Sequence, residues 1–195
     1  MSLPPPVPRR HMHTRNIVCE GYLRADGLWD IEARIEDKKT FRYHEPYRGL
    51  REPGTHVHDM SVRLTIDGQM VVHEVAVSMD ATPYPRCLGA PPAYQGLIGK
   101  KIGLGWRRAV QECVGGVRGC THVRELLFPM ATVAFQTVGG WKELDERDGL
   151  PRHTDDAEMP RFIDGCLAWA SDGEVVAKLY PKLYRKPGPA QREDD

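Results

Sequence analysis

Cysteine and histidine side chains that could carry chemistry gather in residues 81–138, where Cys87, Cys120 and His122 lie. Cys120 and His122 belong to the run Gly-Gly-Val-Arg-Gly-Cys-Thr-His, which leads directly into an apolar, helix-like segment. A thiol just ahead of a helix faces the positive end of the helix dipole, which favours the thiolate, the form that binds metal ions and attacks carbon. Cys120 is therefore the first candidate for a functional residue.

Other donor residues lie where secondary-structure elements are expected to begin or end, which is where ligands tend to sit. His58 and Asp59 come directly before a predicted strand, and Cys87 lies in a proline-rich loop. Thiolate, imidazole and carboxylate groups together suit zinc or an iron–sulfur cluster. We therefore expect a metal site built from Cys87, Cys120, His122, Asp59 and His58, with Cys166 as a reserve ligand.

Two other interpretations remain open. In the first, the protein is an enzyme that acts on a small organic substrate, with Cys120 as nucleophile and His122 as base, or with a bound metal that activates water. Side chains two residues apart at a helix start point about 200° apart, which disfavours direct proton sharing between these two. In the second, the chain is a structural domain whose cysteines are all core residues, as the apolar settings of Cys19 and Cys113 already predict for those two.

Composition limits the classes of partner. Lys+Arg and Asp+Glu both number 27, so the formal charge is zero and nucleic acid is a poor candidate for the partner. The sequence shows no long apolar run and no signal-peptide pattern, so we expect a cytoplasmic protein that does not bind membranes. Its five cysteines should then be reduced. A metal ion or small molecule is the expected partner, and the oligomeric state stays open.

Three Asp-Gly pairs, each between runs of β-branched and aromatic residues, predict three β-hairpins. They are Asp26-Gly27, Asp67-Gly68 and Asp172-Gly173. Residues 41–58 show no period and indicate a long loop, whereas helices are expected near 93–102, near 106–114 and from 121 onward.

The order of strands, helices and strands favours an α+β fold, in which the three hairpins form one antiparallel sheet and the helices pack on one of its faces. We expect a single domain over residues 15–186. Residues 1–14 and 187–195 have the composition of disordered tails, and residues 139–160 that of a linker loop or a short exposed helix.

Three segments are distinctive: CEGYLRADGLWDIEARIEDKKT near the start, GGVRGCTHVREL in the middle and IDGCLAWASDG near the end. Through them the chain as a whole resembles an uncharacterised bacterial family, domain of unknown function 2889. This resemblance implies no activity.

A fainter resemblance covers residues 58–138 and is to iron–sulfur scaffold proteins of the NifU and IscU type. His58-Asp59 precedes a hairpin, Cys87 follows it and Cys120 opens a closing helix, as in that family's order of elements. The family's first cysteine has no counterpart here, and its His-Cys pair is replaced by Cys120-Thr-His122. The resemblance implies metal binding and an IscU-like middle of the fold.

Overall fold

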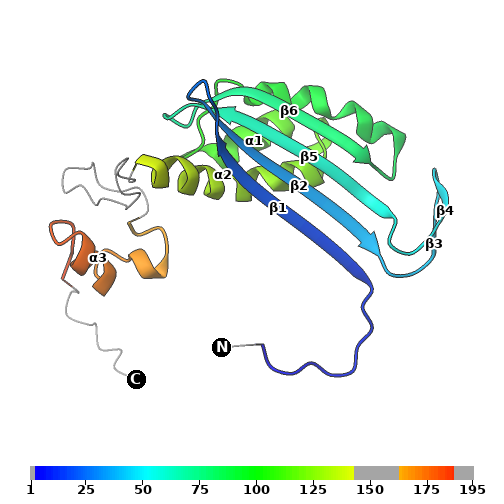
Figure 1. Ribbon diagram of the computed structural model, residues 1–195, viewed down its shortest axis with the longest axis horizontal. Helices are drawn as coiled ribbons and strands as arrows, with labels where there is room; N and C mark the ends of the chain where they lie inside the picture. The colour runs from blue at the N-terminus through cyan, green and yellow to red at the C-terminus, as the bar shows by residue number, and fades with distance from the viewer. Residues whose placement is uncertain (1–2, 143–162, 187–195) are drawn as a thin grey trace. The chain divides into compact units, whose positions relative to one another are not determined.

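The computed structural model describes residues 3–142 and 163–186. The chain divides into two compact units, residues 1–142 and 143–195. The first unit contains an antiparallel sheet with the strand order β1-β2-β5-β6 (Figure 1). Its strands are β1 (His13–Leu23), β2 (Trp29–Lys39), β5 (His56–Ile66) and β6 (Val72–Ala81).

Two of the predicted Asp-Gly hairpins form this sheet. Gly27 adopts a φ of 84° in the turn between β1 and β2, a conformation that side chains disfavour. In the turn between β5 and β6, the Asp67 carboxylate accepts hydrogen bonds from the backbone N–H groups of Gln69 and Val71. Between the two hairpins, β3 (Tyr43–Glu45) and β4 (Gly49–Arg51) form a small hairpin of their own.

Helical segments cover one face of the sheet (Figure 1). The longest, α2 (Thr121–Lys142), packs across β1 and β2, and the 3-10 helix η2 (Pro91–Leu97) packs against β6. The others in this unit are η1 (Pro85–Gly89), α1 (Trp106–Val114) and η3 (Gly116–Arg118). The expected α+β class, with an antiparallel sheet and helices on one face, is confirmed.

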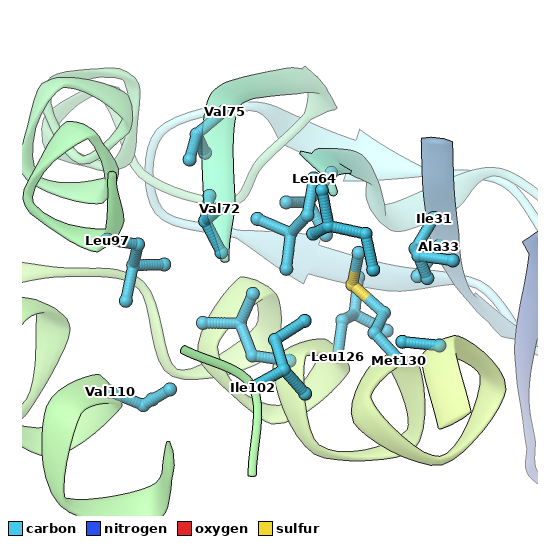
Figure 2. Close-up of a cluster of buried hydrophobic side chains, with 14 of the residues drawn as sticks. Ile31, Ala33, Leu64, Val72, Val75, Leu97, Ile102, Val110, Leu126 and Met130 are labelled. Carbon is cyan, nitrogen blue, oxygen red and sulfur yellow. The ribbon is translucent and has the colours of Figure 1, made fainter. Parts of the chain in front are cut away.

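The core lies between the sheet and these helices. Every second residue of β2 and β5 points toward the helices, because side chains alternate between the two faces of a strand. Figure 2 shows Ile31, Leu64, Leu126 and Met130 meeting in this layer. A fully buried aliphatic side chain contributes about 1.5–3 kcal/mol, so this layer is the main source of the unit's stability.

The prediction of a third hairpin is wrong. In the described part of the second unit, residues 163–186, the chain forms the 3-10 helix η4 (Leu167–Trp169) and the helix α3 (Glu174–Leu179). Gly173 of the third Asp-Gly pair lies directly before α3 in extended conformation. An Asp-Gly pair followed by Glu therefore begins a helix here instead of closing a strand turn, in keeping with the preference for acidic residues in a first helical turn.

Several other boundaries differ from the expectation. The supposed loop 41–58 contains β3, β4 and the start of β5, and the helix expected near 93–102 is the shorter 3-10 helix η2. β1 begins at His13, inside the expected N-terminal tail. The expected tail at 187–195 and most of the expected linker loop lie outside the described residues.

Gly21 of β1 faces α2 at a point where the two elements approach closely. A Cβ added at Gly21 would lie 2.1 Å from the Thr137 Oγ1 atom of α2, so the helix would have to move away from the sheet. We predict that Gly21→Ala lowers the free energy of unfolding by about 1–3 kcal/mol, as overpacking does elsewhere. Gly89→Ala is the matched control, because nothing lies within 4 Å of its added Cβ. Chemical denaturation measures both, and equal stabilities would contradict the prediction.

Candidate functional site

Strand alternation separates the neighbours His58 and Asp59, which the sequence placed in one site. The His58 side chain points toward the helices and is 11% exposed. Asp59 points to the open face, where its carboxylate accepts two hydrogen bonds from the Arg34 guanidinium at 2.8 and 2.7 Å. The structure therefore brings His58, and not Asp59, to the face on which α2 packs.

His122 lies against His58. The two rings are stacked with a centroid separation of 3.7 Å and an angle of 32° between their planes. His122 is the second residue of α2, so the position of the first helical turn over the start of β5 creates the pair. Two of the residues predicted from the sequence thus meet in space.

The Cys120 thiol lies beside the same pair, with its Sγ atom 3.8 Å from the Nδ1 atom of His122 and 3.8 Å from the Sδ atom of Met60. Cys120 immediately precedes the first helical residue. Because it is not itself part of the helix, the 200° divergence expected for helical residues two apart does not separate Cys120 from His122.

Tyr94 holds the backbone of Cys120 in place. The buried Tyr94 hydroxyl donates a hydrogen bond to the Cys120 carbonyl at 2.8 Å and accepts one from the Cys120 N–H at 3.2 Å. Burial is the main reason why the pKa of this hydroxyl is raised, and it stays protonated and able to donate. The position of Cys120 is therefore fixed through its main chain, and these two hydrogen bonds do not involve its sulfur atom.

Asp37 of β2 completes the cluster and was not anticipated as a functional residue. Its side chain is 2% exposed and accepts hydrogen bonds from Arg15 at 2.8 and 2.7 Å and from the His58 Nδ1 atom at 2.9 Å. The His13 Nε2 atom lies 3.1 Å from the same carboxylate. Burial raises the pKa of Asp37, but the hydrogen bonds from Arg15 and His58 outweigh this effect and lower the pKa to about 2. Asp37 is therefore a carboxylate at neutral pH.

Both stacked histidines are neutral at pH 7. Loss of hydration on burial, together with the proximity of His58 and Arg15, lowers the pKa of His122 to about 4. Burial also lowers the pKa of His58, although the hydrogen bond to Asp37 opposes the shift. A neutral His58 that donates from Nδ1 to a carboxylate must carry its lone pair on Nε2. The cluster thus offers imidazole lone pairs and a thiol as donors.

Two groups of side chains in the described ranges could hold a metal ion. Asp37, His58 and His122 present ligand atoms within 4.8 Å of one another, and so do Glu36, His56 and Asp59 on the open face. In the second group, Arg34 and Lys38 already contact the carboxylates, which reduces their attraction for a cation. The first group has two neutral imidazoles and the nearby Cys120 thiol, and is the better candidate. We call Asp37, His58, His122 and Cys120 the His–Cys cluster.

The other four cysteines are not members of the His–Cys cluster. Cys87 is in η1 and is partly buried. Within the described residues no hydrogen bond or ion pair joins it to the cluster, although η1 follows the end of β6 that pairs with Asp59. Cys166 is exposed and belongs to the second unit. Cys19 and Cys113 are partly buried and pack against the core, where the Cys113 thiol donates to the Gly96 carbonyl at 3.2 Å.

The open face of the sheet carries a hollow of about 510 Å³ lined by residues of all four strands. Its charged side chains largely pair with one another, as Arg63 does with Glu32 at 3.5 Å and Arg34 with Glu36 at 3.6 Å. Its lining contains no cysteine and no histidine, so it lacks the thiol and the imidazoles of the opposite face.

The lowered pKa values of His122 and His58 predict how the free energy of unfolding depends on pH. As the pH falls from 6.5 toward 4, the unfolded chain takes up protons on His122 and His58 that the folded protein resists, so the free energy of unfolding falls. For the half-buried His122 ring we expect a loss of about 1–2 kcal/mol after allowance for solvent screening.

Urea unfolding of metal-free protein at pH 4.5 to 7.5 measures this dependence. His122→Gln should flatten it. His44→Gln, which replaces an exposed histidine of β3, is the control. An unchanged slope in His122→Gln would contradict the assignment of a buried neutral imidazole.

Comparisons with known proteins identify a family and no activity. No curated protein and no solved structure matches the chain. The resemblance to NifU and IscU scaffold proteins therefore finds no support among them. None of the described helices is long and apolar enough to cross a lipid bilayer. The model of one family, described as "Protein of unknown function (DUF2889)", matches residues 13–136, which include all strands of the main sheet and the whole His–Cys cluster. The chain belongs to the DUF2889 family.

Proposed function

We propose that this protein binds a zinc ion through His58, His122 and Cys120. The observation that carries the proposal is the stacked, neutral histidine pair, with a thiol 3.8 Å from one ring and a buried carboxylate 2.9 Å from the other. Imidazole nitrogen and thiolate sulfur are the ligands that zinc prefers in proteins. Clusters of iron and sulfur are held mainly by thiolates, so one cysteine beside two histidines favours zinc.

Asp37 supports His58 by accepting its hydrogen bond and is not itself a zinc ligand. Both of its oxygens already accept hydrogen bonds from Arg15, and one of them accepts from His58 Nδ1. A carboxylate in this position fixes the ring orientation of a metal-binding histidine and increases the basicity of its other nitrogen. The Nε2 atom of His58 is then the zinc ligand.

One of the distances that a bound zinc ion would require is already close to its expected value. Around a tetrahedral zinc ion, a thiolate sulfur and an imidazole nitrogen stand about 3.6 Å apart, given bonds of about 2.3 and 2.0–2.1 Å. The Cys120 sulfur and His122 Nδ1 are 3.8 Å apart in the protein. The two rings would need to turn from their stacked arrangement so that their nitrogens face one ion.

A second candidate function follows from the number of ligands. Three protein ligands leave one position of a tetrahedral zinc ion open, which is the arrangement of catalytic rather than structural zinc sites. A water molecule in that position becomes a nucleophile near neutral pH. The second candidate is thus a zinc-dependent enzyme acting on a small organic molecule.

Replacement of Cys120 by serine tests the proposal. We expect wild-type protein, made without a histidine tag, to bind about one zinc ion per chain, and Cys120→Ser to bind at least 10-fold more weakly because a ligand is lost. Folding should be retained, because Tyr94 contacts the main chain of Cys120 and not its sulfur. Elemental analysis and competition with a chromogenic chelator measure the zinc content and affinity.

Cys113→Ser is the matched control, since Cys113 is also partly buried and its thiol donates a hydrogen bond to the Gly96 carbonyl, away from the His–Cys cluster. It should bind zinc as the wild type does. Asp37→Asn should weaken zinc binding by about 10–100-fold, the usual effect of removing such a supporting group. A wild-type protein without zinc affinity, or a Cys120→Ser variant with unchanged affinity, would overturn the proposal.

A further inference from the structure

Strand β1 forms an edge of the main sheet. It pairs with β2 on one side, and among the described residues no strand pairs with its other side (Figure 1). All 11 residues of β1 take part in the pairing with β2, without a shift in register. A long edge of this kind presents a row of unpaired N–H and C=O groups that can pair with another chain.

β1 lacks several of the usual protections of an edge strand. It contains no proline, no lysine and no bulge, and it is twice as long as a typical strand of about 5–6 residues. The Arg15 charge is neutralised by Asp37 on the neighbouring strand. The far edge differs, because β6 is partly covered by backbone hydrogen bonds between Val72 and residues 99–100.

Large apolar side chains are also exposed along this strand. Val18 is 54% exposed, and three others in β1 are each 45% exposed: Ile17, Tyr22 and Leu23. These residues lie on both faces of the strand, so apolar surface accompanies the unpaired backbone throughout. An exposed, unprotected and apolar edge is the signature of a surface that another strand covers.

We infer that two copies of this chain pair through β1 to form a dimer with a continuous eight-stranded antiparallel sheet. The strand is complementary to itself when the two-fold axis passes through Val18. Residues whose numbers sum to 36 then lie opposite each other, so all 11 positions are paired. Because Val18 is the middle of the range His13–Leu23, this register leaves no residue of β1 without a partner.

Side-chain chemistry fits this register. The Asn16 amide lies opposite the Glu20 carboxylate of the second copy, and Ile17 lies opposite Cys19. No two like charges are directly opposite each other, whereas like charges in that position destabilise a pair. In this register an odd-numbered residue of one copy always lies opposite an odd-numbered residue of the other, and an even-numbered residue opposite an even-numbered one. The side chains of opposed residues point to the same face of the sheet. Both helical layers therefore lie on the same face, and the two-fold axis is perpendicular to the sheet.

Light scattering after size-exclusion chromatography tests the inference. We expect about 44 kDa for this chain in solution, twice the 22.0 kDa of one copy. Val18→Lys would place two like charges opposite each other at the axis and should reduce the mass to that of one chain. Val117→Lys is the matched control, because Val117 is a fully exposed valine outside the sheet, and it should leave the dimer intact.

Cross-linking tests the register. In Val18→Cys the two new thiols would face each other across the axis, close enough for a disulfide that joins two chains under mild oxidation. In Tyr22→Cys the two new thiols would be eight residue positions apart, about 26 Å, and should not cross-link. Non-reducing electrophoresis separates the outcomes. The wild-type protein, treated in the same way, shows any cross-linking through native cysteines.

A wild-type mass of one chain at micromolar concentration would overturn the inference, as would a dimer that survives Val18→Lys. A dimer that cross-links through Tyr22→Cys and not Val18→Cys would overturn the register. The test is independent of zinc, because none of the substituted residues belongs to the His–Cys cluster.

Discussion

The alternation of side chains along β2 and β5 is the constraint on which this structure depends. On each strand, every second side chain contributes to the apolar layer under α1 and α2, and the side chains between them face the open side of the sheet. A shift of one residue would reverse both sets, so burial of the apolar residues also determines where each polar residue points. The same constraint brings His58 to the helices and turns Asp59 away from them. The chemistry of the site is therefore decided by the packing of the core.

Much of the fold follows from local sequence signals. Asp-Gly turns between alternating strands predicted two of the hairpins, and the bounds of α1 and the start of α2 agree with their periodicity. The third Asp-Gly pair failed as a hairpin signal because its neighbours, Cys-Leu-Ala-Trp-Ala before it and Glu-Val-Val-Ala-Lys after it, do not alternate. A turn motif alone does not distinguish the end of a strand from the start of a helix. The hydrophobic periodicity of the flanking residues does.

The candidate site was predictable in part. His58, His122 and Cys120 were selected because they lie at element ends, and the structure places them together. Asp37 was overlooked, although the sequence contained its signal: it continues the buried parity of β2 after Trp29, Ile31, Ala33 and Ile35. A carboxylate at a position reserved for apolar side chains requires partners, and Arg15 and His58 supply them. The pairing of β1 with β2 that delivers Arg15 is a tertiary contact and cannot be inferred from local pattern.

The hydrogen bonds of Tyr94 separate the position of Cys120 from its reactivity. A phenol that holds both the N–H and the carbonyl of one residue constrains the path of the chain whatever side chain that residue carries. A substitution can therefore change the side chain at this point while the helix that begins beside it keeps its anchor. Such a position allows evolution to try new reactivity on an unchanged scaffold, and divergence in chemistry between relatives should be sought there first.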